Sequence, residues 1–291
     1  MSFISNLFGY ILNFIYEIVK NYGTSIIIFS ILLKLLLLPL SIKQQKAMKK
    51  NAKIQKKMKE IQDKYKNDQV KMNQEMMNLY KTEKISPFSG CLSMILQIFL
   101  LIAMFGLIRN PLTYMKKIDI NTINEYKIEM QKELGENSVS ANYPEISILK
   151  YINSNNSEND SLYINTNFFG LDLSNIPQEN WSNPTVFIIP VLYVLTSMIS
   201  MRITANMSTK KEEKEIIELN KEENKEELSP EEMTAQMSKS MSWFMPIMSV
   251  SISIITPLGL GLYWLVNNIL MIIERIVLNK FLNFEEEEQN G

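Results

Sequence analysis

A run of 34 residues without a charged side chain, from Ser240 to Ile273, constrains the fold of this chain most strongly. As a single helix this run would be about 51 Å long, whereas the hydrocarbon core of a bilayer is roughly 30 Å thick. Pro257 and Gly259 lie near its middle, and a proline followed closely by a glycine favours a tight turn. The run therefore predicts two short membrane spans, at residues 240–256 and 258–278, joined by a hairpin.

Three further apolar blocks are each long enough to cross a bilayer. Their boundaries predict spans at residues 23–42, where Lys34 is the only charge, at 89–109 and at 183–202. The predicted fold class is therefore an all-α polytopic membrane protein with five transmembrane helices. The mean hydropathy of -0.04 conceals this pattern, because charged segments between the spans offset the apolar blocks.

The distribution of lysines predicts the orientation. The segment from Lys43 to Lys84 carries 13 lysines and five acidic residues. Since loops rich in lysine and arginine stay in the cytoplasm, we expect residues 43–88 to be cytoplasmic and the N-terminus to be outside. Five spans then place a polar loop (110–182) outside, and a charged loop (203–239) and an acidic tail (279–291) inside. The outer loop contains the run NSNNSENDS, which is typical of a flexible linker.

Two segments outside the spans show helical patterns. Residues 1–22 place apolar side chains at helical spacing, which predicts an interfacial amphipathic helix on the outer side: Phe3, Leu7, Ile11, Phe14, Ile15 and Ile18. This segment has no early basic cluster and no small-residue cleavage site, so we expect it to remain in the mature chain. Residues 43–88 carry two narrow apolar stripes, which predict an antiparallel cytoplasmic helical hairpin. The alternative is a basic segment that supplies topology signals only.

Lys34 is the most informative single residue. It lies about 13 Å along the helix axis from the basic segment that begins at Lys43, which places it not far from the midplane of the bilayer. An unpaired charge at this depth costs several kcal/mol unless water or a partner meets it. Ser30 lies on the same helical face as Lys34, which predicts that this face points into the helix bundle. The alternative is that Lys34 extends along its own stem to the cytoplasmic interface.

The other predicted spans carry polar residues at helical spacing that, together with Ser30 and Lys34, are candidates to line a hydrophilic groove. They are Ser93, Gln97, Tyr193, Thr196, Ser200, Tyr263 and Asn267. Hydroxyl and amide groups also join spans by hydrogen bonds, which is the alternative for each of them.

The composition excludes several kinds of chemistry. Cys91 is the only cysteine and the chain has no histidine, so an intrachain disulfide, a histidine-dependent triad and a zinc site with histidine ligands are all excluded. We expect no metal, no cofactor and no enzymatic activity. Three alternatives stay open: a transporter that binds an anionic solute or ion through Lys34, an intramembrane hydrolase with Lys34 as base and Ser30 or Ser41 as nucleophile, and a structural scaffold.

Several motifs, taken in order, resemble the YidC membrane protein insertase family from Tyr22 to Phe281. They are NYGTSIIIFSILLKLLLLPLSIKQ, ISPFSGCLSMILQIFLLIAMFGLIR, FFGLDL, and MPIM followed by PLGLGLYWLVNN. The resemblance implies a five-helix core with a hydrophilic groove that is open to the cytoplasm and lipid but closed to the outside. It implies an insertase or chaperone that receives hydrophobic segments of nascent or newly made proteins and helps them insert and fold in the bilayer.

Lys34 falls where the resembled family usually has an arginine, so the resemblance makes it the groove cation that attracts acidic residues of the substrate. Lysine keeps the charge but lacks the bidentate fork of arginine. The implied location is the cytoplasmic membrane, the implied partners are substrate membrane proteins and lipid, and DNA is not among them. The Sec translocon and the ribosome are further candidate partners, although the tail FNFEEEEQNG is acidic where many family members carry a basic extension associated with ribosome contact.

Overall fold

The computed structural model describes residues 2–65, 68–83, 89–155, 162–209 and 251–290. This part of the chain is almost entirely helical, which confirms the all-α fold class. It divides into two compact units, which we call the first unit (residues 1–32 and 103–273) and the second unit (33–102 and 274–291). Helices α2 (Tyr22–Lys64), α4 (Ser89–Arg109) and α11 (Leu258–Asn290) each contribute to both units.

Three described helices are long and apolar enough to cross a membrane: Tyr22–Ala47, Pro184–Ile203 and Leu258–Phe281. They coincide with the predicted spans at 23–42, 183–202 and 258–278. The predicted span at 89–109 is helical as α4, and its apolar part with described side chains is Ile98–Arg109. The predicted loop at 203–239 and span at 240–256 lie mostly outside the described residues, which resume with helical turns at 251–255.

Two helices continue past the predicted ends of their spans. Helix α2 extends through Pro39 and the apolar-to-basic boundary at residue 42 as far as Lys64. Helix α11 extends through the acidic tail to Asn290. The physical reason is that the change in polarity alters which solvent surrounds the helix, whereas the backbone meets good helix formers such as lysine, glutamine, leucine and glutamate. Hydropathy therefore marks the end of a span but not the end of a helix.

Helix α1 (Ser2–Val19) buries one face and exposes another. The buried face packs on α5 (Pro111–Tyr114) and on the start of α2, where Phe8 meets Phe29 edge to face with ring centroids 5.4 Å apart. Five of the six predicted apolar positions form the exposed face, whereas Ile15 is buried. The Lys117 ammonium also holds α1 in place. It donates one hydrogen bond to the Asn6 backbone carbonyl, at 3.2 Å, and one to Asn6 Oδ1, at 2.7 Å.

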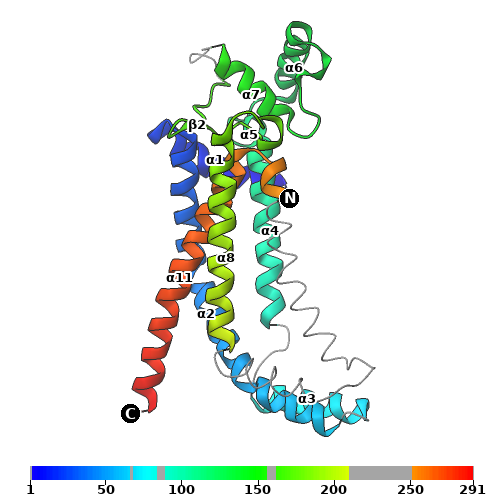
Figure 1. Ribbon diagram of the computed structural model, residues 1–291, viewed down its shortest axis with the longest axis vertical. Coiled ribbons are helices and arrows are strands. Elements are labelled where there is room, and N and C mark those ends of the chain that lie inside the picture. The colour runs from blue at the N-terminus through cyan, green and yellow to red at the C-terminus, as the bar shows by residue number, and fades with distance from the viewer. Residues whose placement is uncertain (1, 66–67, 84–88, 156–161, 210–250, 291) are drawn as a thin grey trace. The chain divides into compact units, whose positions relative to one another are not determined.

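The predicted outer loop at 110–182 is folded where the structure describes it. After α5 it forms α6 (Ile120–Leu134), the short η1 (Glu136–Ser138) and α7 (Pro144–Ser154), and Figure 1 shows α6 and α7 beside each other. Helix α7 buries four of its apolar residues, Ile146, Ile148, Leu149 and Ile152. These buried side chains hold α7 in the fold although the loop is polar in composition. Most of the NSNNSENDS run, which suggested a flexible linker, lies outside the described residues.

The FFGLDL motif forms a small hairpin in the first unit. Strands β1 (Asn167–Phe168) and β2 (Leu171–Asp172) pair antiparallel around Phe169 and Gly170, both of which have positive φ, as a tight two-residue turn requires. Carbonyls on either side of the hairpin accept hydrogen bonds from the first amides of two long helices. The Tyr22 amide of α2 donates to Asn165, and the Leu258 and Gly259 amides of α11 donate to Asn175 and Leu173. The segment thereby satisfies helix-end donors that would otherwise be unpaired.

Two short 3₁₀ turns, η2 (Pro177–Glu179) and η3 (Pro184–Phe187), connect this hairpin to α8 (Ile188–Thr209). The ring of Trp181 lies 5.2 Å from that of Phe187, directly before α8. Aromatic residues of this kind are common where a span meets the membrane surface.

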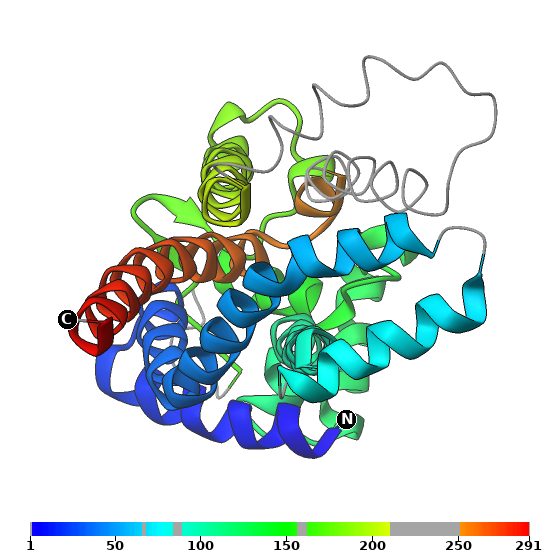
Figure 2. The same ribbon diagram turned by 90° about the horizontal axis from the view of Figure 1, so that it is seen from below.

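In the second unit, the end of α2 contacts α3 (Gln69–Thr82), as Figure 2 shows. Lys57 Nζ lies 2.6 Å from Glu83 Oε1, and the Tyr80 hydroxyl lies 3.7 Å from Met58 Sδ. Asp68 begins α3 by accepting a hydrogen bond from the Lys71 amide. Both contacts join residues that are more than 20 positions apart across the same turn, so the two helices run side by side in opposite directions.

Gly9 allows the close approach of α1 to α5. A Cβ atom at this position would lie 1.8 Å from the Tyr114 carbonyl oxygen, which belongs to the backbone and cannot rotate away. We expect Gly9→Ala to lower the free energy of unfolding by about 1–3 kcal/mol, measured by thermal unfolding in detergent. Gly261→Ala is the control, because its new Cβ would meet only the Ile189 side chain, at 3.1 Å, and the expected loss is smaller. Equal losses would contradict this role of Gly9.

Glu145 is a buried carboxyl whose two oxygens accept hydrogen bonds from Thr113, at 3.0 Å from the amide and 2.6 Å from the hydroxyl. Burial raises its pKa, although the bonds from Thr113 oppose the shift. A pKa that is higher in the folded than in the unfolded state means that stability falls as pH rises from the usual glutamate range through the raised pKa.

Glu145→Gln keeps the shape; its oxygen can still accept from the Thr113 amide, while its NH2 group donates to the Thr113 hydroxyl instead of accepting from it. We therefore expect Glu145→Gln to lose less stability than wild type between about pH 5 and about pH 8. Glu145→Ala leaves the Thr113 amide without its acceptor and is expected to cost about 1–3 kcal/mol. Thermal unfolding of the three proteins at both pH values measures both effects. An identical pH dependence in wild type and Glu145→Gln would contradict the assignment to Glu145.

Candidate functional site

Lys34 lies near the middle of a candidate membrane span, twelve residues after Tyr22 and thirteen before Ala47. Its ammonium nitrogen lies 2.5 Å from Oε2 of Glu274, which belongs to α11 within the candidate span Leu258–Phe281. The Lys34 side chain is 24% exposed and that of Glu274 is 10% exposed. Both residues belong to the second unit, and the ion pair joins α2 to α11 there.

The ion pair offsets the cost of desolvating two charged side chains. Removing one partner of a buried ion pair costs about 3–5 kcal/mol, because the remaining charge is left without compensation. The Lys34–Glu274 pair carries no net charge, so neither side chain has to leave the apolar span to find water. In the structure the Lys34 ammonium therefore has an anionic partner on α11.

Lys34 pairs with only one of the two carboxylate oxygens of Glu274. Its other oxygen, Oε1, is buried and has no hydrogen-bond partner within the described part of the chain. An arginine could donate to both carboxylate oxygens at once, whereas the lysine ammonium acts as a point charge on one of them. Leaving a buried acceptor without a donor costs about 1–3 kcal/mol, so this carboxylate is held less firmly than in a bidentate pair.

Glu274 was not among the predicted site residues. The charge-free run ends at Ile273, and Glu274 lies within the predicted span at 258–278, where no role was predicted for it. The signal was nevertheless present, because Glu274 is followed by Ile276 and Val277 and so lies inside an apolar helix rather than after it. An acidic residue there required a cationic partner in the protein, and Lys34 is the cation that the first predicted span contains.

Three of the other predicted groove residues direct their polar atoms to the backbone of their own helix. The Ser30 hydroxyl, which is buried, donates to the Ile26 carbonyl at 2.7 Å. The Thr196 hydroxyl donates to the Leu192 carbonyl, and the Asn267 amide donates to the Tyr263 carbonyl, both at 2.9 Å. These bonds stay within one helix, so they are not the hydrogen bonds between spans that were the alternative to lining a groove.

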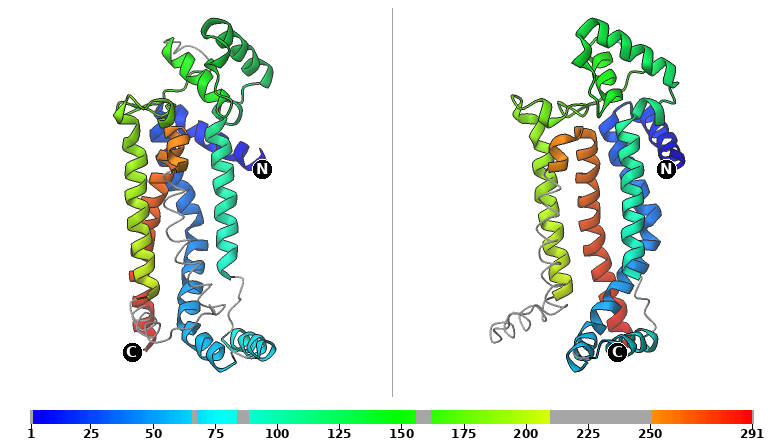
Figure 3. Two further views of the ribbon diagram at one scale, coloured as in Figure 1. Left: turned by 45° about the vertical axis from the view of Figure 1, so that its right-hand side comes forward. Right: turned by 90° about the vertical axis from the view of Figure 1, so that its right-hand side faces the viewer.

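The contact between α8 and α11 in the first unit uses one predicted residue, Tyr193, and three residues that were not predicted. The Asn268 amide donates to the Ser197 hydroxyl at 2.6 Å, and the ring centroids of Tyr193 and Trp264 lie 5.7 Å apart. Figure 3 shows α8 beside the first turns of α11. Asn268 and Ser197 were missed because each has a polar neighbour, and spacing alone does not show which of two adjacent polar residues faces the other helix.

The remaining predicted residues have mixed outcomes. Ser200 and Tyr263 are buried, at 5% and 6% exposure. The side chains of Ser93 and Gln97 lie outside the part of the chain that the structure describes. Among the described residues, no group of three metal-binding side chains is close enough to hold a metal ion.

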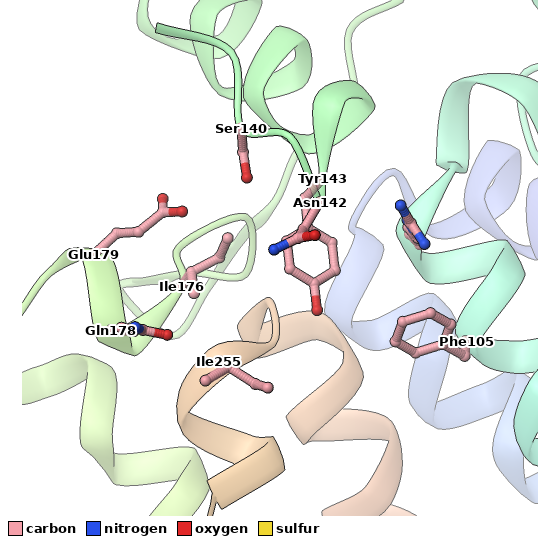
Figure 4. A pocket seen from close by; sticks show the side chains of 9 residues that line it. Phe105, Ser140, Asn142, Tyr143, Ile176, Gln178, Glu179 and Ile255 are labelled. Atoms are coloured by element: carbon pink, nitrogen blue, oxygen red, sulfur yellow. The ribbon is translucent and has the colours of Figure 1, made fainter. Parts of the chain in front are cut away.

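A separate cavity of about 580 Å³ lies in the first unit, and none of the predicted site residues lines it. Figure 4 shows Phe105 and Ile255 on one side of it and Ser140 and Glu179 on the other. Arg109 also lines this cavity, with its guanidinium 6.0 Å from the centroid of the Tyr143 ring. Burial raises the pKa of the Tyr143 hydroxyl, although the Arg109 charge opposes the shift. This cavity is amphipathic but contains no charged pair comparable to Lys34 and Glu274.

A family model described as 60Kd inner membrane protein matches residues 14–287. The chain is 27% identical to the membrane protein insertase YidC of Caldanaerobacter subterraneus subsp. tengcongensis over 278 residues, which is 95% of this chain and 94% of that protein. It is 28% identical to the membrane protein insertase YidC of Rickettsia conorii over 94% of this chain but only 38% of that longer protein.

A third relative, the membrane protein insertase YidC of Fusobacterium nucleatum, is 37% identical over 38% of this chain and 56% of its own length. The chain thus spans nearly all of one relative and less than two thirds of the other two. The family match covers both helices of the Lys34–Glu274 pair and all three candidate spans. The chain is therefore a multi-pass membrane protein that belongs to the YidC membrane protein insertase family, whose family model is described as 60Kd inner membrane protein.

Proposed function

We propose that this protein is a membrane protein insertase that receives hydrophobic segments of newly made proteins and helps them enter and fold in the lipid bilayer. The observation that carries the proposal is the match, over nearly the full length of both chains, to a relative that is named a membrane protein insertase. The charged residue near the middle of its first candidate span also supports the proposal.

The proposed topology has five spans, with the N-terminus outside and the C-terminus inside. The spans are residues 23–42, 89–109, 183–202, 240–256 and 258–278, and the basic segment 43–88 is a cytoplasmic helical hairpin. The antiparallel contacts between α2 and α3 support the hairpin. The exposed apolar face of α1, with Phe3 77% and Phe14 69% exposed, supports an interfacial helix on the outer surface.

The proposed mechanism needs no covalent chemistry. A hydrophilic groove within the membrane shortens the hydrocarbon path that a polar segment of the substrate has to cross, and so lowers the desolvation cost of crossing. The favourable free energy comes from the apolar span of the substrate as it enters lipid. The insertase thus lowers a barrier, and the substrate supplies the driving force.

In this mechanism Lys34 is the groove cation that attracts acidic residues in the translocated segment of the substrate. A charge in an apolar surrounding is screened little by salt, so its attraction remains effective at physiological ionic strength. The substrate proteins and the lipid bilayer are the proposed partners, with the Sec translocon and the ribosome as candidates.

The alternative functions find less support. No relative reported above carries the name of a transporter. The hydrolase alternative requires Lys34 to act as a base toward a serine, whereas its ammonium is bound to Glu274 and the Ser30 hydroxyl is bound to the Ile26 carbonyl. The insertase is therefore the function that we carry forward.

Insertion of a small single-span substrate with an acidic N-terminal tail into proteoliposomes tests the proposal. We expect Lys34→Ala and Lys34→Glu to reduce the initial rate about tenfold or more, which corresponds to about 1.4 kcal/mol of lost attraction. Lys34→Arg keeps the charge but pairs more firmly with Glu274, so we expect its rate to lie between wild type and Lys34→Ala. Lys34→Ala also leaves Glu274 without a partner, so the double variant Lys34→Ala/Glu274→Gln is needed to separate folding from function. We expect this double variant to be folded and still slow.

Lys57→Ala is the matched control, because it removes a lysine from an exposed ion pair in the same unit. It is expected to insert the substrate at the wild-type rate. Equal insertion by wild type and all Lys34 variants would contradict the role of the cation, whereas failure of wild type itself would contradict the insertase function.

A further inference from the structure

The Lys34–Glu274 pair presents a problem for the proposed mechanism, since the cation that should attract the substrate already has an anionic partner. We infer that Glu274 is an internal competitor: its carboxylate occupies the place on Lys34 that a substrate carboxylate takes during insertion, and thereby limits productive engagement to segments acidic enough to displace it. This inference rests on the proposed function and deepens it, because it assigns a specificity-determining role to a second residue.

The geometry supports a mechanism in which a substrate carboxylate replaces Glu274 on Lys34, rather than one in which both carboxylates bind Lys34 together. Lys34 and Glu274 lie within ion-pair distance, at 2.5 Å, and the Glu274 side chain is 10% exposed. A second carboxylate that approached the same ammonium would face Glu274 at short range, and like charges in an apolar surrounding repel each other strongly. An incoming acidic residue therefore has to replace Glu274, which leaves the number of ion pairs on Lys34 unchanged.

The pair is also built so that it can open. Only one oxygen of Glu274 is bound to Lys34, while Oε1 is buried without a hydrogen-bond partner within the described residues. Release lets this carboxylate gain hydrogen bonds from water, which offsets part of the lost attraction. Arg275, the next residue, already interacts electrostatically with Glu274 and remains close to the displaced charge. A bidentate arginine–carboxylate pair would lack the unsatisfied oxygen and would be harder to open.

The substrate class follows from this competition. A tail with one or more carboxylates can exchange with Glu274, whereas a neutral or basic tail gains nothing from Lys34 and leaves the pair closed. Since a ligand that binds only the open form is weakened in proportion to how rarely that form occurs, a pair that is open about one time in ten reduces the apparent affinity for an acidic tail about tenfold. Glu274 thus sets how acidic a segment must be.

Glu274→Gln tests the inference, because it removes the competing charge and keeps the size of the side chain. The assay compares two substrates in proteoliposomes at subsaturating concentration: a single-span protein with an acidic tail, and the same protein with each tail carboxylate replaced by its amide. We expect Glu274→Gln to raise the initial rate for the acidic substrate about tenfold and to leave the rate for the neutral substrate unchanged. Glu83→Gln, which removes a carboxylate from the exposed pair with Lys57, is the matched control and should change neither rate.

Loss of insertion for both substrates in a folded Glu274→Gln protein would show a structural role and overturn the inference, as would equal rates in the variant and wild type. If Glu274→Gln does not fold, Glu274→Asp replaces it, since the shorter side chain keeps the charge but reaches Lys34 less well. A selective gain for the acidic substrate in Glu274→Asp supports competition, and the absence of a selective gain overturns it. Failure of the proposed function has a different signature, because wild type would then insert neither substrate.

Discussion

A charge within a membrane span must be met by a partner, because the cost of desolvating it alone is several kcal/mol. In this protein Lys34 on α2 and Glu274 on α11 meet this requirement for each other, at 2.5 Å. The pair lets two apolar helices carry charged residues without breaking their contact with lipid. It also places a cation and an anion at one point in the second unit, and the proposed function depends on that point.

A related constraint acts on the backbone, since the first amides of a helix have no partners within the helix itself. In the first unit the segment around the FFGLDL hairpin supplies these partners for α2 and α11, through the carbonyls of Asn165, Leu173 and Asn175. This segment is therefore part of the folded core of the first unit rather than only a connection between helices. Buried Glu145, bound to Thr113, fastens α7 to α5 in the same unit.

Membership of the YidC membrane protein insertase family gives the ion pair a functional setting. In an insertase that lowers a desolvation barrier, the strength of a single cation matters less than whether that cation is available. A lysine paired with one carboxylate oxygen is available more readily than an arginine held by two. In the proposed mechanism, the choice of lysine at position 34 is thus linked to the carboxylate at position 274, and selectivity for substrates is a property of the pair.

The sequence by itself determined the all-α fold class, three spans that coincide with candidate membrane helices, and the presence of one charge, Lys34, inside the first of them, because partition into lipid depends on composition summed over a segment. The tertiary structure alone decided which side chains meet. It paired Lys34 with Glu274, chose Asn268 over Asn267 for the contact with Ser197, and folded α7 within the polar loop between the second and third predicted spans. These outcomes depend on the rotation of each helix about its axis and on contacts between segments far apart in the chain, and neither is contained in local composition or spacing.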